Sequence, residues 1–422
     1  MTPPVSSILG ALDVGNHRVL ALLAERDEHA KLVIRGVGTA ASAGLQNGQV
    51  VQLQPLVLAI RKAVEEAEYM AGVTLESVYA STAGTFVTGR MTSATVALGP
   101  PEREVRSRDL EQAHLAVQWQ ALPPNHMVLN VLTHSYGLDG QEGLVDPIEM
   151  VGQKLSLEAY VLACQKQPVL ALERAINKAG LRVKEFLFAP VAAALACLTP
   201  DERRLGSLLV DIGFANTCYA AVVGERVVAA GCLPLGSGKV NTDLVYCFHT
   251  TTQGAEEAKV QAGTVLLSEI DPEETVTVPS IDGRGHYLIP RREMNTTIRL
   301  RMHEIFEIVT KQVIRDCPSG MPSAGVVLVG GGSHLDGVAA LAEEVFGTRC
   351  RLGEPEDVED ATQLLQNSEL PARSAAVAVG LLTYAAHSWM PTVAPAARLH
   401  AGKSNWLLNK VRKVLSRKGV TR

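Results

Sequence analysis

Two short motifs place an aspartate and a glycine at the end of an apolar segment. A DVG motif, with Asp13 and Gly15, ends the apolar segment 6–15, and a DIG motif, with Asp211 and Gly213, ends another. An aspartate in this position can hold hydrated Mg²⁺, while the bare glycine backbone approaches phosphate oxygens. Facing each other from two domains, the motifs would clamp the phosphates of a nucleotide.

A third motif, GGGS at 330–333, follows the apolar segment 324–329 and precedes an amphipathic segment. A nucleotide can lie against such a backbone and against the start of the next helix. Alone, this motif is equally typical of an ordinary tight turn. Together with the aspartate motifs it predicts a nucleotide site, in which Asp13 and Asp211 hold Mg²⁺ through water.

Other catalytic and nucleotide-binding motifs are not found. The Gly238-Lys239 pair is followed by Val240 and has no glycine five residues earlier, so it is not a P-loop. The GVGTAA segment at 36–41 lacks the third glycine of a dinucleotide fingerprint. No GxSxG or HExxH motif is present, and no catalytic residue is assigned.

Apolar periodicity predicts the elements that must position these motifs. Three apolar segments within 6–39 are typical of a β-meander, and a helix is expected over 55–72. The segment 206–236 repeats the meander, and Asp211 precedes Gly236 by 25 residues, as Asp13 precedes Gly38. Such self-similarity indicates two related domains. Between them, 86–164 is predicted to be an inserted α+β unit, with a helix over 107–121 that has Ser107 as its N-cap.

Composition indicates an ordinary globular protein with more than one core. The chain has 422 residues, of which 47% are hydrophobic and 20% charged, so two to four compact units are expected. Its seven cysteines form no CxxC pair, which favours reduced thiols in a cytoplasm over disulfides or a zinc site. No signal peptide and no spanning apolar segment are evident, so a soluble or peripheral protein is predicted.

Charge is divided unevenly along the chain. The net charge is −5, but no acidic residue follows Glu369, whereas nine Lys or Arg residues do. An acidic body argues against general nucleic-acid binding, and the basic tail is predicted to be an electrostatic device.

The end of the chain is predicted to be an amphipathic helix over 405–418, after a Pro/Ala-rich linker at 387–404. On a helical wheel its apolar residues share one arc of roughly 120° with basic residues around it. This pattern favours a helix lying on an anionic membrane surface. The alternatives are a helix packed on the protein itself and a solvated basic tail. The predicted membrane residues are Trp406, Leu407, Leu408, Lys410, Val411, Lys413, Val414, Leu415 and Arg417.

The order DxG, DxG, GGG resembles the actin, Hsp70 and sugar-kinase superfamily. Within it, LDVGNHRV (12–19), VDIGFANTCYA (210–220), PVAAALACL (190–198) and AAVAVGLLTYA (375–385) resemble stretches of the bacterial FtsA cell-division family. The resemblance covers nearly the whole chain and implies a two-lobed actin-like α/β fold with an inserted subdomain. The expected subdomains are 1–85 with 165–200, 86–164, 205–254 with 320–386, and 255–319.

The resemblance implies that the chain binds ATP with Mg²⁺. It places a nucleoside-binding pair at Glu256 and Lys259, and a contact for the C-terminal peptide of FtsZ at Arg301 and Glu304. The alternative is that Arg301 and Glu304 are ordinary solvent-exposed residues of a helix and contact no partner. The predicted nucleotide-binding residues are Asp13, Gly15, Asn16, His17, Arg18, Asp211, Gly213, Asn216, Thr217, Gly236, Glu256, Lys259, Gly330, Gly331, Gly332 and Ser333.

The second phosphate loop departs from the family pattern. Phe214 and Ala215 stand where glycines are usual, and Cys218 stands where a second aspartate is expected. The first two changes restrict the approach of the backbone to phosphate, and the third removes a carboxylate. ATP binding with at most slow hydrolysis is therefore expected.

The function implied by the resemblance is that of an actin-like cell-division protein. It would self-associate into filaments, work with other division proteins, and tether FtsZ to the cytoplasmic face of the inner membrane at the septum. No nucleic acid is expected as a partner. The alternatives are a metabolite kinase of the same fold, an Hsp70-like chaperone and a pilus-assembly actin homologue. No general base stands out for a kinase, and too little chain follows residue 386 for a peptide-binding domain.

Overall fold

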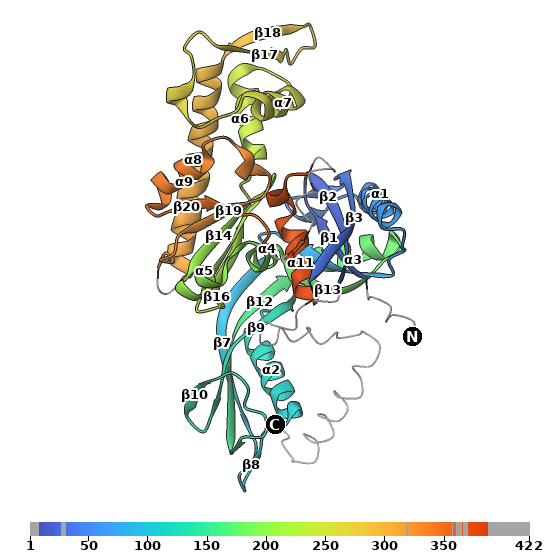
Figure 1. The fold of residues 1–422 in the computed structure, drawn as a ribbon, viewed down its shortest axis with the longest axis vertical. Coiled ribbons are helices and arrows are strands. Elements are labelled where there is room, and N and C mark those ends of the chain that lie inside the picture. The colour runs from blue at the N-terminus through green and yellow to red at the C-terminus, as the bar shows by residue number, and fades with distance from the viewer. Residues whose placement is uncertain are drawn as a thin grey trace, which may run out of the picture.

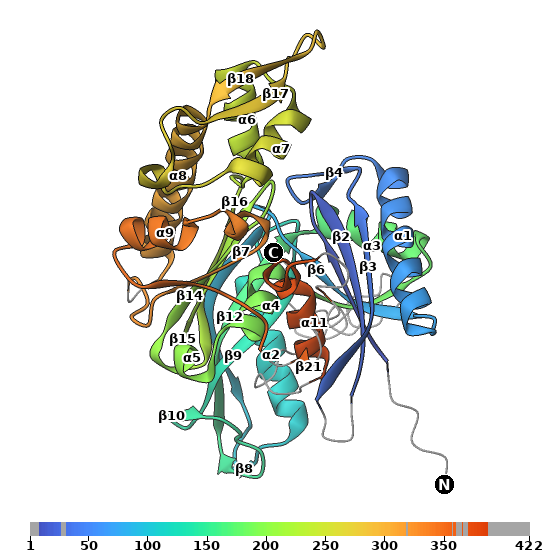
Figure 2. The same ribbon diagram turned by 45° about the horizontal axis from the view of Figure 1, so that its top comes forward.

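The computed structural model describes residues 8–26, 31–317, 320–356, 358–359, 365 and 370–386. This part of the chain forms two lobes, each built on a β-sheet, and a further domain extends away from them (Figure 1). Seen from a second direction, helices α4 and α11 lie between the two sheets (Figure 2).

The first lobe contains a six-stranded sheet in the order β13-β6-β1-β2-β3-β21. The first three strands in sequence are antiparallel, and β6 and β13 join them parallel to β1. Helices α1 and α3 pack on one face and α11 packs on the other, which explains why these strands are apolar along most of their length. The elements are β1 (Leu9–Val14), β2 (Arg18–Arg26), β3 (Leu32–Ala41), β4 (Leu45–Gln46), β5 (Gln49–Val50), α1 (Leu53–Ala71), β6 (Ser77–Thr82), α3 (Lys166–Lys178), β13 (Arg182–Phe188) and β21 (Val358–Glu359).

The second lobe repeats this topology. Its five-stranded sheet has the order β16-β15-β14-β19-β20, with β14, β15 and β16 antiparallel and β19 and β20 parallel to β14. Three antiparallel strands followed by two parallel ones also describe the first lobe, so the predicted pair of related domains is confirmed. The elements are α5 (Pro200–Leu205), β14 (Ser207–Ile212), β15 (Thr217–Val223), β16 (Arg226–Leu233), α8 (Arg291–Asp316), β19 (Val326–Val329), η2 (Gly331–His334), α9 (Val338–Phe346) and β20 (Cys350–Leu352).

Two helices of small residues join the lobes at their centre. All nine residues of α4 (Ala189–Cys197) are buried, and α11 (Ala376–Ala386), which follows η3 (Ala372–Ala375), packs against it. A Cβ atom on Gly380 would lie 1.8 Å from the carbonyl oxygen of Ala192. The helices therefore touch through their backbones, and any larger residue at Gly380 would push the lobes apart.

The inserted domain is a four-stranded antiparallel sheet, in the order β10-β9-β12-β7, with helix α2 packed on it. It begins directly after β6 and ends at α3, and Figure 1 shows it projecting from the base of the two lobes. The predicted α+β insertion is thus confirmed. Its elements are β7 (Val87–Ala97), β8 (Arg103–Glu104), α2 (Ser107–Ala121), β9 (His126–Leu138), β10 (Gln141–Leu144), β11 (Val151–Gly152) and β12 (Lys154–Gln165).

The start of α2 differs from the prediction. Ser107 is the first helical residue, and Arg106 occupies the N-cap position. The carboxylate of Asp109 accepts the backbone N–H of Arg106 at 2.9 Å and also receives two hydrogen bonds from the Arg103 guanidinium at 2.7 Å each. The Asp109 carboxylate thus closes the first turn onto Arg106, one residue before Ser107, so the assignment of Ser107 as the N-cap was wrong.

A small subdomain stands on the second lobe. It comprises α6 (Gly238–Phe248), α7 (Thr252–Ala262), η1 (Leu267–Glu269), β17 (Thr275–Pro279) and β18 (His286–Pro290), packed around α8. The subdomain boundary expected between residues 254 and 255 falls inside α7, and α6 packs against both α7 and α8. The change of subdomain therefore comes near residue 238.

The predicted linker and amphipathic helix, 387–404 and 405–418, lie outside the described residues. Within the ranges that are described, no helix is long and apolar enough to cross a membrane.

Candidate functional site

The two aspartate motifs form matching turns at the ends of β1 and β14. In the first, the N–H of Gly15 donates to the carbonyl of Arg18 at 3.0 Å; in the second, the N–H of Gly213 donates to the carbonyl of Asn216 at 2.9 Å. The next strand begins three residues after Gly15 in the first turn and four residues after Gly213 in the second. Repetition of the lobe therefore places two similar loops at one cleft, which both line.

The two carboxylates are half-buried in this cleft. Asp13 accepts a hydrogen bond from the hydroxyl of Ser81, which ends the neighbouring strand β6, at 2.6 Å. Asp211 lies against Gly330: a Cβ atom at Gly330 would be 2.2 Å from its Oδ1. Because Gly330 also has a φ of +83°, only glycine fits at this position.

Burial raises the pKa of both aspartates, and repulsion by Asp13 adds to the shift at Asp211. Burial and the nearby charge of Asp13 raise the pKa of Asp211 to about 7. Burial also raises the pKa of Asp13, although the Ser81 hydrogen bond and the Arg18 charge oppose this shift. A half-buried pair of like charges is stabilised by a cation, so this part of the cleft is suited to a divalent ion.

We expect Asp211→Asn to stabilise the ligand-free protein, and to do so more at pH 8 than at pH 5. The pKa of Asp211 is raised, so its favourable contribution is complete below about pH 4 and is lost as the pH rises through about 7. Each pKa unit corresponds to about 1.4 kcal/mol, and asparagine removes the penalty at high pH. Thermal unfolding at the two pH values tests this, with the exposed Asp146→Asn as control. An equal effect of Asp211→Asn at both pH values would contradict it.

The glycine motif forms the wall beside Asp211. The N–H of Gly330 donates to the carbonyl of Arg373 at 3.1 Å, and the hydroxyl of Ser333 donates to the carbonyl of Gly330 at 2.7 Å. His334 and Ser374 share a hydrogen bond of 2.9 Å. Burial, with the charges of Arg373 and Arg18, lowers the pKa of His334 to about 4, so this histidine is neutral at pH 7.

The small subdomain supplies the opposite wall through three linked side chains. The Lys259 ammonium lies 2.7 Å from Glu256 Oε2 and donates to Asn241 Oδ1 at 2.9 Å, while Asn241 Nδ2 donates to Glu256 at 2.5 Å. Burial alone would raise the pKa of Glu256, but the hydrogen bonds from Lys259 and Asn241 lower it overall. The predicted nucleoside pair is thus held as a charged, pre-oriented group on α6 and α7.

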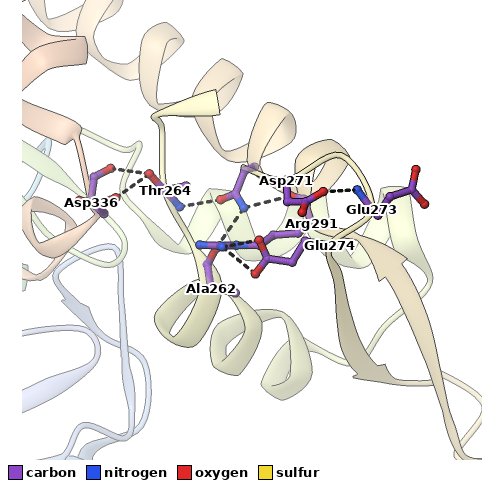
Figure 3. A network of polar contacts seen from close by, with 8 residues as sticks. Ala262, Thr264, Asp271, Glu273, Glu274, Arg291 and Asp336 are labelled. Atoms are coloured by element: carbon purple, nitrogen blue, oxygen red, sulfur yellow. Dashed lines mark hydrogen bonds and ion pairs between the residues drawn. The ribbon is translucent and has the colours of Figure 1, made fainter. Parts of the chain in front are cut away.

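A second network fixes the chain between this wall and the glycine motif (Figure 3). Thr264 donates from its hydroxyl to Asp336 at 2.8 Å and from its N–H to Asn295 at 2.6 Å. The carbonyl of Ala262 accepts from Asn295 at 3.0 Å and from Arg291 at 3.1 Å. The network connects the end of α7 to α8 and to the loop before α9, so it sets the position of the wall of the small subdomain.

The cleft has a volume of about 590 Å³. Thirteen of the sixteen predicted nucleotide-binding residues line it; Thr217, Gly236 and Ser333 do not and lie behind the loops. Five further residues of the site were not predicted from the sequence: Ser81, Asn241, His334, Arg373 and Ser374. For Ser81 the sequence gives a weak indication of a place in the site, because this residue lies near the end of an apolar segment that was predicted to be a strand.

Two buried polar atoms of the second loop have no hydrogen-bond partner. They are Oδ1 of Asn216, which lines the cleft, and Oγ1 of Thr217. Unsatisfied polar groups of this kind are uncommon, and Oδ1 of Asn216 is available to hydrogen-bond a ligand in the cleft. With two acidic groups and with glycine backbone on two walls, the cleft fits a phosphate-bearing ligand with a divalent cation.

The side chain of Phe214 makes the second loop differ from the first. Its ring lies 5.2 Å from the ring of His17 on the first loop, so the two lobes are in contact across the cleft. Its carbonyl accepts the N–H of Gly238 at 2.8 Å, at the start of α6. The ring therefore fills space between the phosphate loops that a glycine would leave open.

The predicted FtsZ contact is already occupied within the chain. The Arg301 guanidinium donates to both carboxylate oxygens of Asp243, at 2.6 and 2.8 Å, and also pairs with Glu304. Asp243 lies on α6, so the pair joins α6 to α8. An acidic peptide would therefore have to compete with Asp243 for Arg301.

Two lobes of matching topology, with a polar cleft between them and a domain inserted in the first, define an actin-like protein. The family model "Cell division protein FtsA" matches residues 208–380, and the model "SHS2 domain inserted in FTSA" matches residues 84–163. The chain is 33% identical over 373 residues to the FtsA protein of Pseudomonas aeruginosa, covering 88% of each chain. It is 30% identical over 404 residues to that of Escherichia coli, covering 94% of each. The chain belongs to the FtsA family of cell division proteins.

A solved structure supports the same fold. The chain resembles a type IV pilus biogenesis protein solved as the PilM–PilN complex, with a TM-score of 0.64 and 18% identity, over 91% of this chain and all of that one. At this identity the likeness concerns the fold alone.

Proposed function

We propose that this protein binds ATP with Mg²⁺ in the cleft, self-associates, and tethers FtsZ to the cytoplasmic face of the inner membrane at the division septum. The observation that carries the nucleotide proposal is the half-buried pair Asp13 and Asp211 between two glycine-containing loops. Membership of the FtsA family supports a role in division with other division proteins.

Each part of the cleft has an expected partner on the nucleotide. Asp13 and Asp211 would hold Mg²⁺ through water, and the ion would neutralise charge on the phosphates and on the carboxylates. The backbones of 15–18 and 213–216 would contact the phosphates, because their N–H groups lie at the ends of the hairpins. Glu256 and Lys259 would hold the nucleoside against 330–332.

Hydrolysis is expected to be slow. Phe214 and Ala215 bring side chains into a loop where the family usually has glycine, and Cys218 lines the cleft without adding a carboxylate. Four of the described residues that line the cleft carry carboxylates: Asp13, Asp211 and Glu256 have assigned binding roles, and Asp336 accepts a hydrogen bond from Thr264. The protein is therefore proposed to use ATP mainly as a bound ligand. A metabolite kinase is disfavoured for the same reason.

The tethering function is tested by asking whether the protein carries FtsZ to a membrane. FtsZ alone should remain in the supernatant when anionic vesicles are sedimented. With this protein and Mg-ATP added, FtsZ should pellet with the vesicles. If the protein pellets and FtsZ does not, the tethering proposal is wrong.

We expect Arg301→Glu to weaken binding of the FtsZ C-terminal peptide and Asp243→Asn to strengthen it. Arg301→Glu repels an acidic peptide, whereas Asp243→Asn frees the guanidinium by removing its internal partner. A change of a few-fold in each direction is expected from one partly exposed charge pair, measured by fluorescence anisotropy of a labelled peptide. Arg315→Glu, at the far end of α8, is the matched control. If the two substitutions shift affinity in the same direction, Arg301 is not the contact.

A further inference from the structure

Cys218 lines the cleft, and a second cysteine opposes it on the neighbouring strand. Cys218 on β15 and Cys232 on β16 are directly paired in the antiparallel register, so their side chains lie on the same face of the sheet. Their sulfur atoms are 2.7 Å apart, shorter than an ordinary nonbonded contact. Both are free thiols. Fold and register, rather than chance proximity of flexible side chains, hold the two sulfurs together.

The two thiols differ in their surroundings. Cys218 is 2% exposed and lines the cleft. Cys232 is partly exposed, so a small oxidant reaches it more easily. One thiol can react first, and the other is positioned to resolve the product.

We propose that Cys218 and Cys232 form a reversible disulfide when the protein meets a peroxide. The Cys232 thiolate attacks one peroxide oxygen and breaks the O–O bond, which gives a sulfenic acid and one water after proton transfer. The Cys218 sulfur then attacks the sulfenic sulfur and releases a second water. Two thiols lose two electrons and two protons, and hydrogen peroxide becomes two waters. A dithiol reductant returns both thiols.

A disulfide between Cys218 and Cys232 would constrain the second phosphate loop. Cys218 lies two residues after Asn216 in that loop, and Cys232 precedes the segment whose Ser237 and Gly238 N–H groups donate to Gly213 and Phe214. The disulfide would therefore join the two strands that carry the loop and its support. This inference does not depend on nucleotide binding, because the bond is measured directly.

Peptide mapping tests the proposal in a Cys247→Ser background, which removes the exposed thiol and so prevents crosslinking between molecules. After treatment with equimolar hydrogen peroxide, trypsin separates Cys218 into peptide 205–226 and Cys232 into peptide 227–239. We expect these peptides to be joined, two thiols to be lost, and dithiothreitol to restore both.

Two variants show whether the disulfide forms specifically between Cys218 and Cys232. Cys232→Ala should abolish peroxide-dependent loss of the Cys218 thiol, whereas Cys350→Ala, at another partly exposed cysteine, should leave the joined peptides unchanged. Oxidation of Cys232 to a sulfinic acid with Cys218 still free would overturn the proposal, as would pairing of either residue with another cysteine. Mapping the unsubstituted chain under the same conditions guards against a variant that fails to fold.

Discussion

Removing residues 405–422 should release the protein from anionic vesicles while leaving the described body folded. The prediction rests on the sequence of the tail, whose apolar residues share one arc and which carries no acidic residue. Each partly buried apolar side chain contributes about 1 kcal/mol, and each basic residue near anionic lipid contributes a similar amount. Ordering an isolated helix of this length opposes binding, so reversible attachment is expected.

Substitutions within the tail separate its apolar and charged contributions. Leu407→Glu with Val411→Glu places two charges on the apolar arc and should release the protein nearly as well as the deletion. Asn409→Glu with Ser416→Glu adds the same charge on the opposite side of the wheel and should weaken binding far less. High salt should weaken wild-type binding only in part, because salt screens charges and not apolar contacts. Equal sedimentation of the deletion variant and the wild type would show that another part of the chain is the anchor.

Gly331→Leu should abolish nucleotide binding without unfolding the protein. A Cβ atom at Gly331 would meet nothing within 4 Å, and Gly331, unlike Gly330, is not among the glycines with positive φ. Because Gly331 lines the cleft, a leucine there takes up ligand space and does not clash with the protein. We expect affinity to fall at least about 100-fold, which corresponds to roughly 2.8 kcal/mol.

A graded series at this position provides the control. Gly331→Ala adds one methyl group and should lose far less affinity than Gly331→Leu, while both variants should unfold at nearly the wild-type temperature. Calorimetry measures the affinity, and thermal unfolding measures the stability. If Gly331→Leu binds ATP as tightly as the wild type, the nucleotide does not lie against the glycine motif.

The motifs that could be predicted from the sequence are those whose functional residues lie within a few consecutive positions. The two aspartate turns and the glycine turn were recognisable because each combines its special residues with the end of a strand. Their equal intervals also predicted the repeated lobes, which the matching sheet orders confirm.

The contacts that could not be predicted join residues far apart in the chain. Arg301 pairs with Asp243 across 58 positions, and Ser81 reaches Asp13 across 68. Each is a common polar residue without a local signal, and only the packing of α6 on α8, or of β6 beside β1, brings it to its partner. The cap of α2 was missed for a related reason, because Asp109 is fixed by Arg103 as well as by the helix.

The central claim is that the cleft between the lobes is a magnesium-dependent nucleotide site, and titration of the wild-type protein with ATP tests it most directly. Calorimetry with Mg²⁺ present should give one site per chain with affinity near the micromolar range. Chelation of the ion should weaken binding strongly, because the half-buried carboxylates of Asp13 and Asp211 would then face the phosphates without a cation between them. Absence of binding with Mg²⁺, or equal binding without it, would contradict the assignment of the cleft.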